Sequence, residues 1–363
     1  MELALYCPNY GYYETKIDIG RRGDFYTSAS TGELFGQLLA FQFAEWLTTE
    51  VRGQPPSHRA GDASRVSIVE AGAHDGKLAA DILNWLQVCR PRLFSELEYV
   101  ILEPSLRRRG WQKETLRDFT NVRWFADFPD ARAQIPNSRL NGIIFSNELL
   151  DAFPIHRFGW DAKNKSWFEW GVAAKDDKFV WSKIQNSGSR IRNSELEAVL
   201  PDNYTIETSP AADNWWHEAA KSLGRGKLLT IDYGFTADEL ISPARTNGTL
   251  RAYLKHHATE DPLANPGEQD LTAHVNFLAI QKAGEDAGLI TESFLTQSQF
   301  LTRILKQAAK EKALGGLAAS KLGEAGWSEG QTRQFQTLTH PEHLGRAFRV
   351  LVQDRPLRTI RAQ

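Results

Sequence analysis

The segments that most constrain the fold are VSIVEAGAHDGKLAADIL and, after it, YVILEPS, whose order is typical of a nucleotide-binding βαβ unit. Val66 to Val69 predict a short buried strand, and Leu78 to Leu86 carry the apolar face of a following helix. Gly72 and Gly76 bracket the tight turn between them. Small residues in such a turn allow backbone N–H groups to come close to a ligand, so the pattern predicts a nucleotide site.

Two acidic residues lie at the ends of the strands in this unit. A second strand, Tyr99 to Leu102, ends in Glu103, at the position from which a carboxylate accepts hydrogen bonds from a ribose diol. Glu70, at the end of the first strand, adds a second acceptor. A carboxylate there stabilises a ligand that carries ammonium and sulfonium charges, whereas it gives little to a ligand bound through its phosphates. This difference favours S-adenosylmethionine (SAM) over NAD. His74 replaces the usual middle glycine of the turn, and an ordinary α/β core without a nucleotide is the alternative interpretation.

The remaining apolar segments predict an α/β fold. Strands are expected over 122–126, 142–146, 228–232, 290–295 and 348–353, and helices over 34–46 and 276–287. Because strands alternate with helices and the chain closes on two late strands, we expect a doubly wound, mostly parallel sheet. We expect a single elaborated domain over 1–363, with an N-terminal cap and loop over 1–60, a β-meander insertion over 155–200 and a helical addition over 296–345.

Composition and charge exclude several functional classes. The formal net charge is -2 with both signs interspersed, so nucleic acid is not expected as a partner, and the basic run Arg107 to Arg109 is interpreted as a solvated helix face. Cys7 and Cys89 are too few for a disulfide framework or a zinc site, which indicates a reducing compartment. No apolar stretch approaches the roughly 20 residues of a membrane span, and no signal peptide is recognisable. We therefore expect a soluble cytoplasmic protein.

Polar residues follow the fourth and fifth predicted strands, where open α/β sheets bind ligands. Asn147, Glu148 and Asp151 follow the fourth strand, and Asp232 and Tyr233 follow the fifth. The ordinary role of any one such acid is a helix cap or a loop salt bridge. Alternatively, Glu148 and Asp151 could face one way on a first helical turn, where they would hold a guanidinium or act as a general base.

Two long polar segments, 10–36 and 248–277, are rich in glycine and have the character of binding loops. The first contains the sequence GDFYTS. The second contains His256, His257 and His274, whose spacing matches no zinc pattern, so no metal is expected.

The chain resembles the MidA-like SAM-dependent methyltransferase family over about 6–300. Six motifs that occur in this order in the family are GYYETKIDIGRRGDFYTS, EAGAHDGKLAADIL, NELLDAFPIHRF, IDYG, GTLRAY and PGEQDLTAHVNF. The mitochondrial member of that family is an arginine methyltransferase needed for assembly of respiratory complex I. The resemblance implies a seven-stranded Rossmann-like methyltransferase sheet. Relatives carry a further helical segment before the equivalent of Met1, so we expect a truncated or internally assigned start.

The resemblance also implies roles for individual residues. Gly72 and Gly76 would line the methionine end of SAM, Glu103 would hold the ribose and Asp127 would approach the adenine. Together with Glu70, the expected cofactor-binding set is Gly23, Asp24, Thr27, Glu70, Gly72, Gly76, Glu103, Asp127 and Asn147. The expected catalytic set is Asn147, Glu148, Asp151 and His257, with His274 as an alternative proton relay. His74 departs from the family's glycine, so its side chain must point away from SAM or reshape the pocket.

The implied reaction is direct methyl transfer from SAM to a nitrogen of a protein arginine, on a respiratory-complex subunit or its bacterial counterpart. Aligning donor and acceptor and excluding water would be the main contributions of the enzyme. The competing hypothesis is a non-catalytic assembly chaperone on a methyltransferase scaffold. An NAD-dependent dehydrogenase is disfavoured by His74. The sequence leaves the oligomeric state open, a homodimer included.

Overall fold

The computed structural model describes residues 1–15, 27–52, 66–135, 140–184, 199–242, 245–254, 257–259, 261–313 and 327–356. The chain packs as two compact units. Unit 1 comprises Met1–Phe25, Leu150–Trp215 and Gly234–Ile280, and unit 2 comprises Tyr26–Leu149, Trp216–Tyr233 and Gln281–Gln363. The predicted meander falls in unit 1, the predicted helical addition falls in unit 2, and the predicted N-terminal cap is divided between them.

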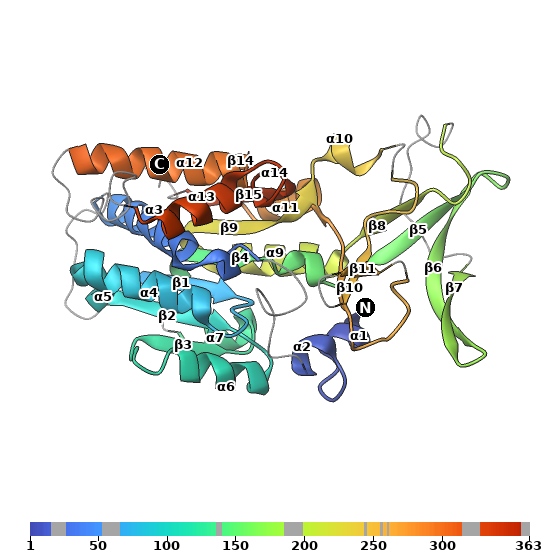
Figure 1. Ribbon diagram of the computed structural model, residues 1–363, viewed down its shortest axis with the longest axis horizontal. Coiled ribbons are helices and arrows are strands. Elements are labelled where there is room, and N and C mark those ends of the chain that lie inside the picture. Colours follow the sequence, from blue (N-terminus) through green and yellow to red (C-terminus); the bar gives the residue numbers. More distant parts are fainter. Residues whose placement is uncertain are drawn as a thin grey trace, which may run out of the picture. The chain divides into compact units, whose positions relative to one another are not determined.

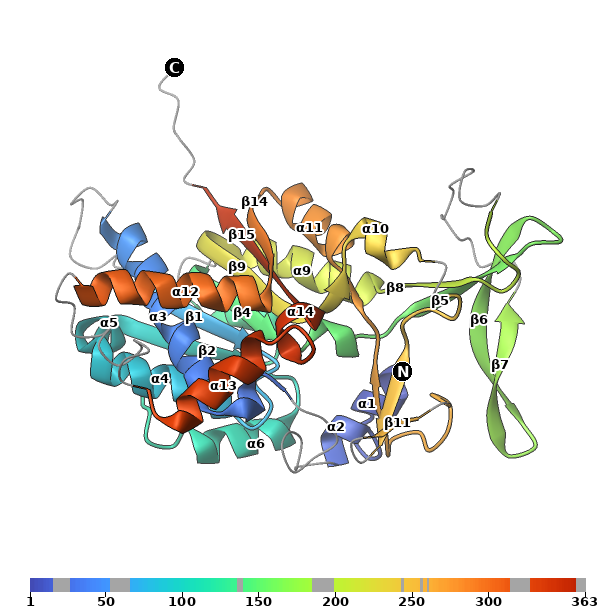
Figure 2. The same ribbon diagram turned by 45° about the horizontal axis from the view of Figure 1, so that its top comes forward.

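Unit 2 is built on a central sheet with the strand order β14-β15-β9-β4-β1-β2-β3. The strands are β1 (Val66–Ala71), β2 (Leu97–Leu102), β3 (Val122–Phe125), β4 (Leu140–Asn147), β9 (Leu223–Phe235), β14 (Ile290–Thr296) and β15 (Phe348–Arg355). Strands β3, β2, β1, β4 and β9 pair in parallel, and β15 runs antiparallel to both of its neighbours. Figure 2 shows β15 between β14 and β9. Within the described residues, this seven-strand path confirms the predicted doubly wound, Rossmann-like fold.

Helices cover the sheet and bury its strands, which explains why the strands are apolar. Those whose residues lie wholly or partly in unit 2 are α3 (Glu33–Arg52), α4 (Lys77–Cys89), α5 (Pro91–Glu96), α6 (Leu106–Thr115), α7 (Phe128–Gln134), α9 (Pro210–Ser222), α11 (Phe277–Asp286), α12 (Gln297–Ala313), α13 (Glu329–Thr339) and α14 (Leu344–Ala347). One face of the sheet forms a hydrophobic core with α3, α4 and α12. Strand β1 is buried from Ser67 to Ala71, as expected for a parallel strand that is covered on both faces.

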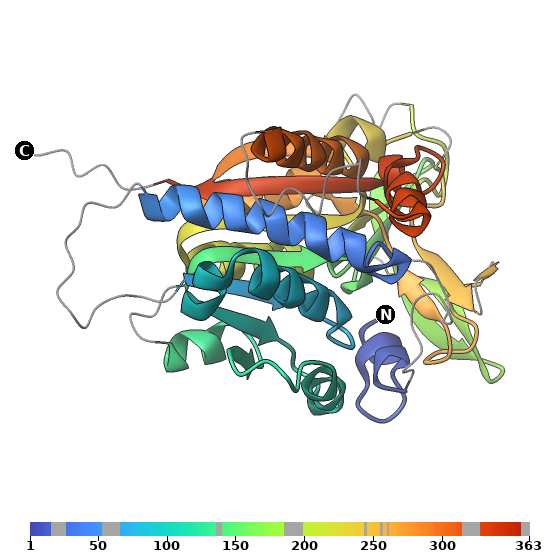
Figure 3. The same cartoon turned by 60° about the vertical axis from the view of Figure 1, so that its left-hand side comes forward.

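Helices α3 and α4 lie side by side over the sheet (Figure 3). They pack closely at Gly36, where an added Cβ would lie 2.5 Å from the Cβ of Asp81. The glycine therefore sets the spacing of the helix that follows GDFYTS and the helix that follows the glycine turn. A larger residue would push the two helices apart.

Unit 1 consists mainly of antiparallel sheets (Figure 1). Its strands are β5 (His156–Asp161), β6 (Ser166–Lys175), β7 (Lys178–Ile184), β8 (Thr205–Thr208), β10 (Arg251–Leu254), β11 (His257–Thr259), β12 (Asp270–Thr272) and β13 (Val275–Asn276). The last of these pairs in parallel with the end of β9, at Gly234 and Phe235. Strands β5, β6 and β7 pair antiparallel in chain order. The short helices are α1 (Glu2–Tyr6), α2 (Tyr12–Thr15), η2 (Leu150–Ala152) and α10 (Ala237–Leu240). A small core of Leu5, Tyr12, Ala152, Ala252 and Leu271 joins α1, α2, η2, β10 and β12.

No helix among the residues with described positions combines the length and the apolar composition needed to cross a membrane.

Candidate functional site

The glycine turn between β1 and α4 has three residues in the left-handed region. Gly72, His74 and Gly76 have φ values of 76°, 46° and 83°. The amide of Gly76 donates to the carbonyl of Ala73 at 2.7 Å, which closes the turn immediately before α4 begins at Lys77. Left-handed backbone costs a residue with a Cβ about 1–2 kcal/mol, so glycine is favoured at 72 and 76. Histidine is among the residues that tolerate this region, and His74 preserves the turn that the family's glycine would make.

The ring of His74 lies beside Trp111 of α6, with 6.2 Å between the ring centroids. Its Nδ1 atom is 3.8 Å from Oδ1 of Asp75, and the side chain is 26% exposed. The imidazole ring of His74 therefore lies between the turn and α6.

Glu103, which follows β2, is 2% exposed and accepts several hydrogen bonds. Its Oε1 accepts from the Ser105 amide at 2.9 Å and from Nε and Nη2 of Arg108 at 3.0 and 2.9 Å. Its Oε2 accepts from Nε2 of Gln112 at 3.2 Å. Three of these donors contact Oε1 and one contacts Oε2, so a ribose hydroxyl would meet the less crowded oxygen, Oε2, beside the Gln112 amide.

The interpretation of Arg107 to Arg109 as a solvated helix face is wrong for two of its three members. Arg108 is 9% exposed and pairs with Glu103, and Nε of Arg109 donates to the carbonyl of Glu103 at 2.6 Å. Only Arg107 is exposed. The reason is that α6 begins at Leu106, so its first turn faces the end of β2.

Gln112 of α6 is a site residue that the sequence analysis missed. It is fully buried, and its Nε2 donates to the carbonyl of His74 at 3.0 Å as well as to Glu103. Its Oε1 accepts from Nε1 of Trp124 at 3.1 Å. Gln112 is four residues after Arg108 and shares its helix face, which is the one sequence signal that could have located it.

Glu70 is buried at the end of β1, with 2% of its surface exposed. Its Oε2 accepts a hydrogen bond from the Tyr99 hydroxyl at 2.7 Å. Burial raises the pKa of Glu70 to about 8, against the opposite effect of that hydrogen bond. Its expected role as an acceptor for the ammonium group of SAM stays a prediction.

Glu148, directly after β4, is held by contacts with two other motifs. Its amide donates to the carbonyl of Ile231 at 2.9 Å, and its Oε1 accepts from the Ser28 amide and from Nδ2 of Asn147, both at 2.9 Å. Burial raises the pKa of Glu148 to about 8; the two hydrogen bonds lower it, and the negative charge of Asp232 raises it further.

Glu148 does not lie on a helical turn, so that part of the prediction is wrong. Its φ is 52°, and the 3₁₀ helix η2 begins only at Leu150. A left-handed residue other than glycine costs about 1–3 kcal/mol and often marks a functional position.

The end of the GDFYTS motif docks on this acid. Ser28 is fully buried, and its Oγ donates to Oε1 of Gln297 at 3.0 Å while its amide donates to Glu148. Thr27 and Ser30 exchange hydrogen bonds that close the turn before α3. The structure thus joins two motifs that the sequence analysis assigned separately to cofactor and acceptor. Gly23 and Asp24 lie outside the described residues.

Asp151 belongs to unit 1, where three motifs meet. It is 6% exposed in η2, and its carbonyl accepts from the amide of Ala273 at 2.8 Å. The Tyr13 hydroxyl donates to Oδ1 of Asp270 at 2.7 Å. Burial and the negative charges of Asp270 and Asp151 raise the pKa of Tyr13 well above its ordinary value. Asp270 is a second buried acid that the sequence analysis did not identify.

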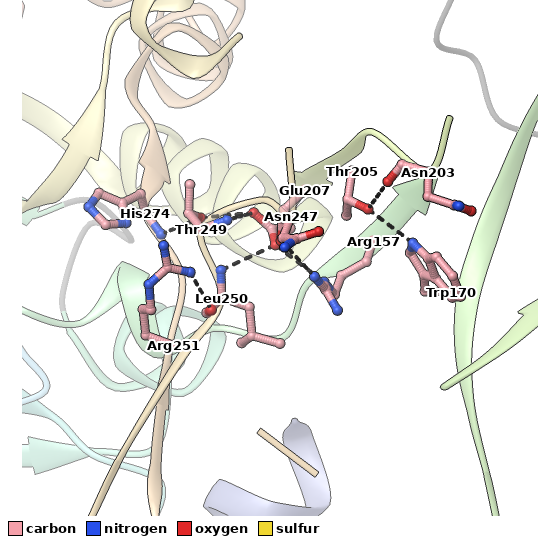
Figure 4. A network of polar contacts seen from close by, with 10 residues as sticks. All are labelled: Arg157, Trp170, Asn203, Thr205, Glu207, Asn247, Thr249, Leu250, Arg251 and His274. Atoms are coloured by element: carbon pink, nitrogen blue, oxygen red, sulfur yellow. Dashed lines mark hydrogen bonds and ion pairs between the residues drawn. The ribbon is translucent and has the colours of Figure 1, made fainter. Parts of the chain in front are cut away.

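Glu207 of β8 organises the GTLRAY motif (Figure 4). Its side chain is 6% exposed and accepts from Nε of Arg157 at 3.3 Å, from the Thr249 amide at 2.6 Å and from the Leu250 amide at 3.2 Å. The Thr249 hydroxyl also contacts Glu207 at 2.9 Å and accepts from the amide of His274 at 3.0 Å. A Cβ at Gly248 would lie 2.2 Å from Oε1 of Glu207 and would displace this carboxylate, and the φ of 73° also favours glycine.

The remaining predicted residues have ordinary local roles in the structure. His274 stacks on Phe235 with 4.5 Å between ring centroids, and burial, followed by the charges of Arg251 and Arg245, lowers its pKa to about 4. His257 is exposed on β11, and His256 is outside the described residues. Asp127 is exposed and caps α7 by accepting from the amide of Asp130 at 2.8 Å. The functional roles expected for Asp127 and His257 stay predictions.

Relatives and solved structures match nearly the whole chain. The mitochondrial protein arginine methyltransferase NDUFAF7 homolog of Drosophila melanogaster is 27% identical over 372 residues, covering 97% of this chain and 79% of that protein. Mitochondrial NDUFAF7 of Danio rerio is 26% identical over 390 residues, covering 96% of this chain and 80% of that protein. A crystal structure of a candidate methyl transferase from Burkholderia thailandensis, bound to S-adenosyl-homocysteine, is 31% identical with a TM-score of 0.77 and covers 98% of this chain and 86% of that chain.

The names of these relatives contradict the cytoplasmic location expected from the sequence, because both are mitochondrial proteins. The cytoplasmic expectation is wrong because it used the low cysteine content as its main indicator. Neither Cys7 nor Cys89 forms a disulfide, but reduced cysteines do not distinguish one reducing compartment from another.

The residues at the ends of β1 and β2 fit SAM. Three left-handed residues shape a turn with close backbone approach, and a buried carboxylate follows the adjacent strand at Glu103. The model of the S-adenosyl-L-methionine-dependent methyltransferase family matches residues 39–295, which include both strands and the Glu148 motif. The fold, the turn and this match agree, and the chain belongs to that family of SAM-dependent methyltransferases.

Proposed function

We propose that the protein transfers the methyl group of SAM to a guanidinium nitrogen of an arginine in a protein substrate. The proposal draws on the relatives, which are named protein arginine methyltransferases. The substrate that we propose is a respiratory-complex subunit or its bacterial counterpart, as the family resemblance implies.

The observation that carries the proposal is the environment of Glu148. A guanidinium has a pKa above about 12 and is a poor nucleophile while its charge is delocalised, so the reaction needs a group that localises the charge and accepts a proton. A general base is most effective when its pKa is close to the working pH. Burial raises the pKa of Glu148 to about 8, which supports such a role.

The neighbours of Glu148 orient its carboxyl group. Ser28 and Asn147 both donate to Oε1, which leaves Oε2 to receive the proton in the proposed reaction. The left-handed backbone of Glu148 departs from the extended conformation of β4. These constraints are typical of a residue that is held in place for catalysis.

The cofactor would be held by the glycine turn at its methionine end and by Glu103 at its ribose. Bound SAM supplies an electrophilic methyl group on a sulfonium centre. The protein residues then have three tasks: to align the guanidinium, to accept its proton and to exclude water. We propose that Glu148 accepts the guanidinium proton. Asp151 stays the second proposed acid on the basis of its sequence position alone.

The test is Glu148→Gln, assayed with purified respiratory-complex subunits and isotopically labelled SAM, with methylated residues mapped by mass spectrometry. We expect SAM affinity by calorimetry to stay within about threefold and methyl transfer to fall by roughly 100-fold or more. Wild-type turnover should rise with pH toward 8, because a general base acts only when deprotonated. The matched control is Glu114→Gln, because Glu114 is an exposed acid on α6 that pairs only locally with Arg117.

Full methyl transfer by Glu148→Gln would remove this residue from the reaction. SAM binding without methyl incorporation in any subunit, by the wild-type protein, would instead support the non-catalytic assembly role.

A further inference from the structure

We propose that Gln112 is a positioning residue for SAM binding, whose side-chain amide fixes the glycine turn relative to the carboxylate of Glu103. This inference rests on the cofactor-binding part of the proposed function and not on the identity of the methyl acceptor. Gln112 contacts both parts of the proposed cofactor site, through the carbonyl of His74 and through Oε2 of Glu103.

The orientation of the Gln112 amide is determined by its three neighbours. The indole nitrogen of Trp124 can only donate, so the atom 3.1 Å from it must be the amide oxygen. The amide nitrogen then faces the carbonyl oxygen of His74 and Oε2 of Glu103. A carbonyl oxygen accepts hydrogen bonds and cannot donate, and the same holds for an ionised carboxylate. Each hydrogen of the NH₂ group has one acceptor, and a flipped amide would lose all three bonds.

The Gln112 amide joins two segments that are not adjacent in sequence. The carbonyl of His74 belongs to the turn after β1, and Glu103 follows β2. The backbone of Gln112 also packs closely on the turn, since a Cβ at Gly76 would lie 3.3 Å from its Cα. One helical residue therefore sets the separation between the group proposed for the methionine end and the group proposed for the ribose.

Such preorganisation affects affinity because a ligand that must order its own site binds more weakly. Without the amide, the carbonyl of His74 and one oxygen of Glu103 would each lose a buried donor. Hydrogen bonds to charged groups are the stronger class, so this loss should weaken SAM binding by about 10- to 100-fold. A residue that only filled space would change stability and leave the affinity of the folded protein unchanged.

The experiment compares Gln112→Met with wild type, because methionine has a similar volume and no donor. Calorimetry with SAM and with S-adenosyl-homocysteine gives Kd, and a thermal melt gives Tm. The matched control is Gln134→Met, because Gln134 is an exposed residue of α7 and its side-chain amide donates to Asp130. We expect a Kd raised about 10-fold or more for Gln112→Met and unchanged for Gln134→Met.

A folded Gln112→Met protein with the wild-type Kd would overturn the proposal. If Gln112→Met does not fold, Trp124→Phe removes the indole N–H that orients the amide and keeps an aromatic ring at this position, and a Kd raised several-fold is expected. An unchanged Kd in Trp124→Phe would then overturn it. The readout of this experiment is SAM binding. If the expected changes in Kd are observed but the wild-type protein does not methylate arginine, the proposed function is refuted and the role of Gln112 in SAM binding stands.

Discussion

Replacing Glu70 by glutamine should change how the stability of the protein depends on pH. Glu70 is 2% exposed and hydrogen-bonds to Tyr99, and burial raises its pKa from 4.5 to about 8. Below pH 4.5 the carboxyl is protonated in both the folded and the unfolded chain. Between pH 4.5 and 8 the unfolded chain loses the proton while the folded protein keeps it, so the free energy of unfolding falls as pH rises.

The size of this effect follows from the two pKa values. At about 1.36 kcal/mol for each pKa unit, the rise from 4.5 to about 8 corresponds to a loss of the order of 5 kcal/mol by pH 9. Glu70→Gln cannot ionise and should not show this loss. The glutamine oxygen can still accept from Tyr99, but the new NH₂ group needs an acceptor, at a cost of about 1–3 kcal/mol that is independent of pH.

The assay is urea unfolding of wild type, Glu70→Gln and the surface control Glu114→Gln at pH 5, 7 and 9. The stability of Glu70→Gln relative to wild type should increase from pH 5 to pH 9 by several kcal/mol. A difference that stays constant across this range would refute the reasoning. Calorimetry on the same proteins tests the other expected role, since a Kd for SAM that rises in Glu70→Gln would indicate that this carboxyl holds the ammonium group.

Three further changes have definite expected outcomes. Gly76→Val should abolish SAM binding and lower Tm, because a β-branched residue at a φ of 83° costs at least about 1–2 kcal/mol; a folded variant with normal affinity would exclude the turn from the cofactor site. Glu103→Ala should destabilise the protein by about 3–5 kcal/mol in urea unfolding, because it leaves Arg108 buried without its carboxylate. Adding Arg108→Met should restore part of that loss, and strictly additive losses would show that the pair is not coupled. Glu207→Ala should cost about 2–4 kcal/mol, because it removes the acceptor for Thr249 and Leu250, and an unchanged unfolding midpoint would contradict this.

The sheet could be predicted from sequence because its strands are covered on both faces. The apolar run 142–146 predicted the centre of β4, which extends from Leu140 to Asn147, and 228–232 predicted the centre of β9. The strand ends were missed because they contain polar residues such as Arg225 and Lys227, which pair with neighbouring strands through their backbone. Backbone pairing leaves no trace in a hydrophobicity pattern.

The residues that shape the candidate site were harder to predict. Arg108 and Glu207 look like ordinary surface charges in the sequence, and only tertiary packing buries them against their partners. The left-handed conformation of Glu148 has no sequence signal, since glutamate does not favour it. Motif order located the neighbourhood of each residue, whereas the contact between Ser28 and Glu148 required the three-dimensional structure.

The strand order of unit 2 has a consequence for how the protein is made. Strands β3, β2, β1 and β4 are complete by Asn147, and they can pair while later residues are still being synthesised. Strand β9 follows a long segment of unit 1, and its far edge is paired by β15, Phe348–Arg355, which also carries β14. Until β15 is translated, that edge presents unpaired backbone groups to other chains. We therefore expect the nascent chain to be prone to aggregation in the interval between β9 and β15, and its yield to depend on chaperones that shield this edge.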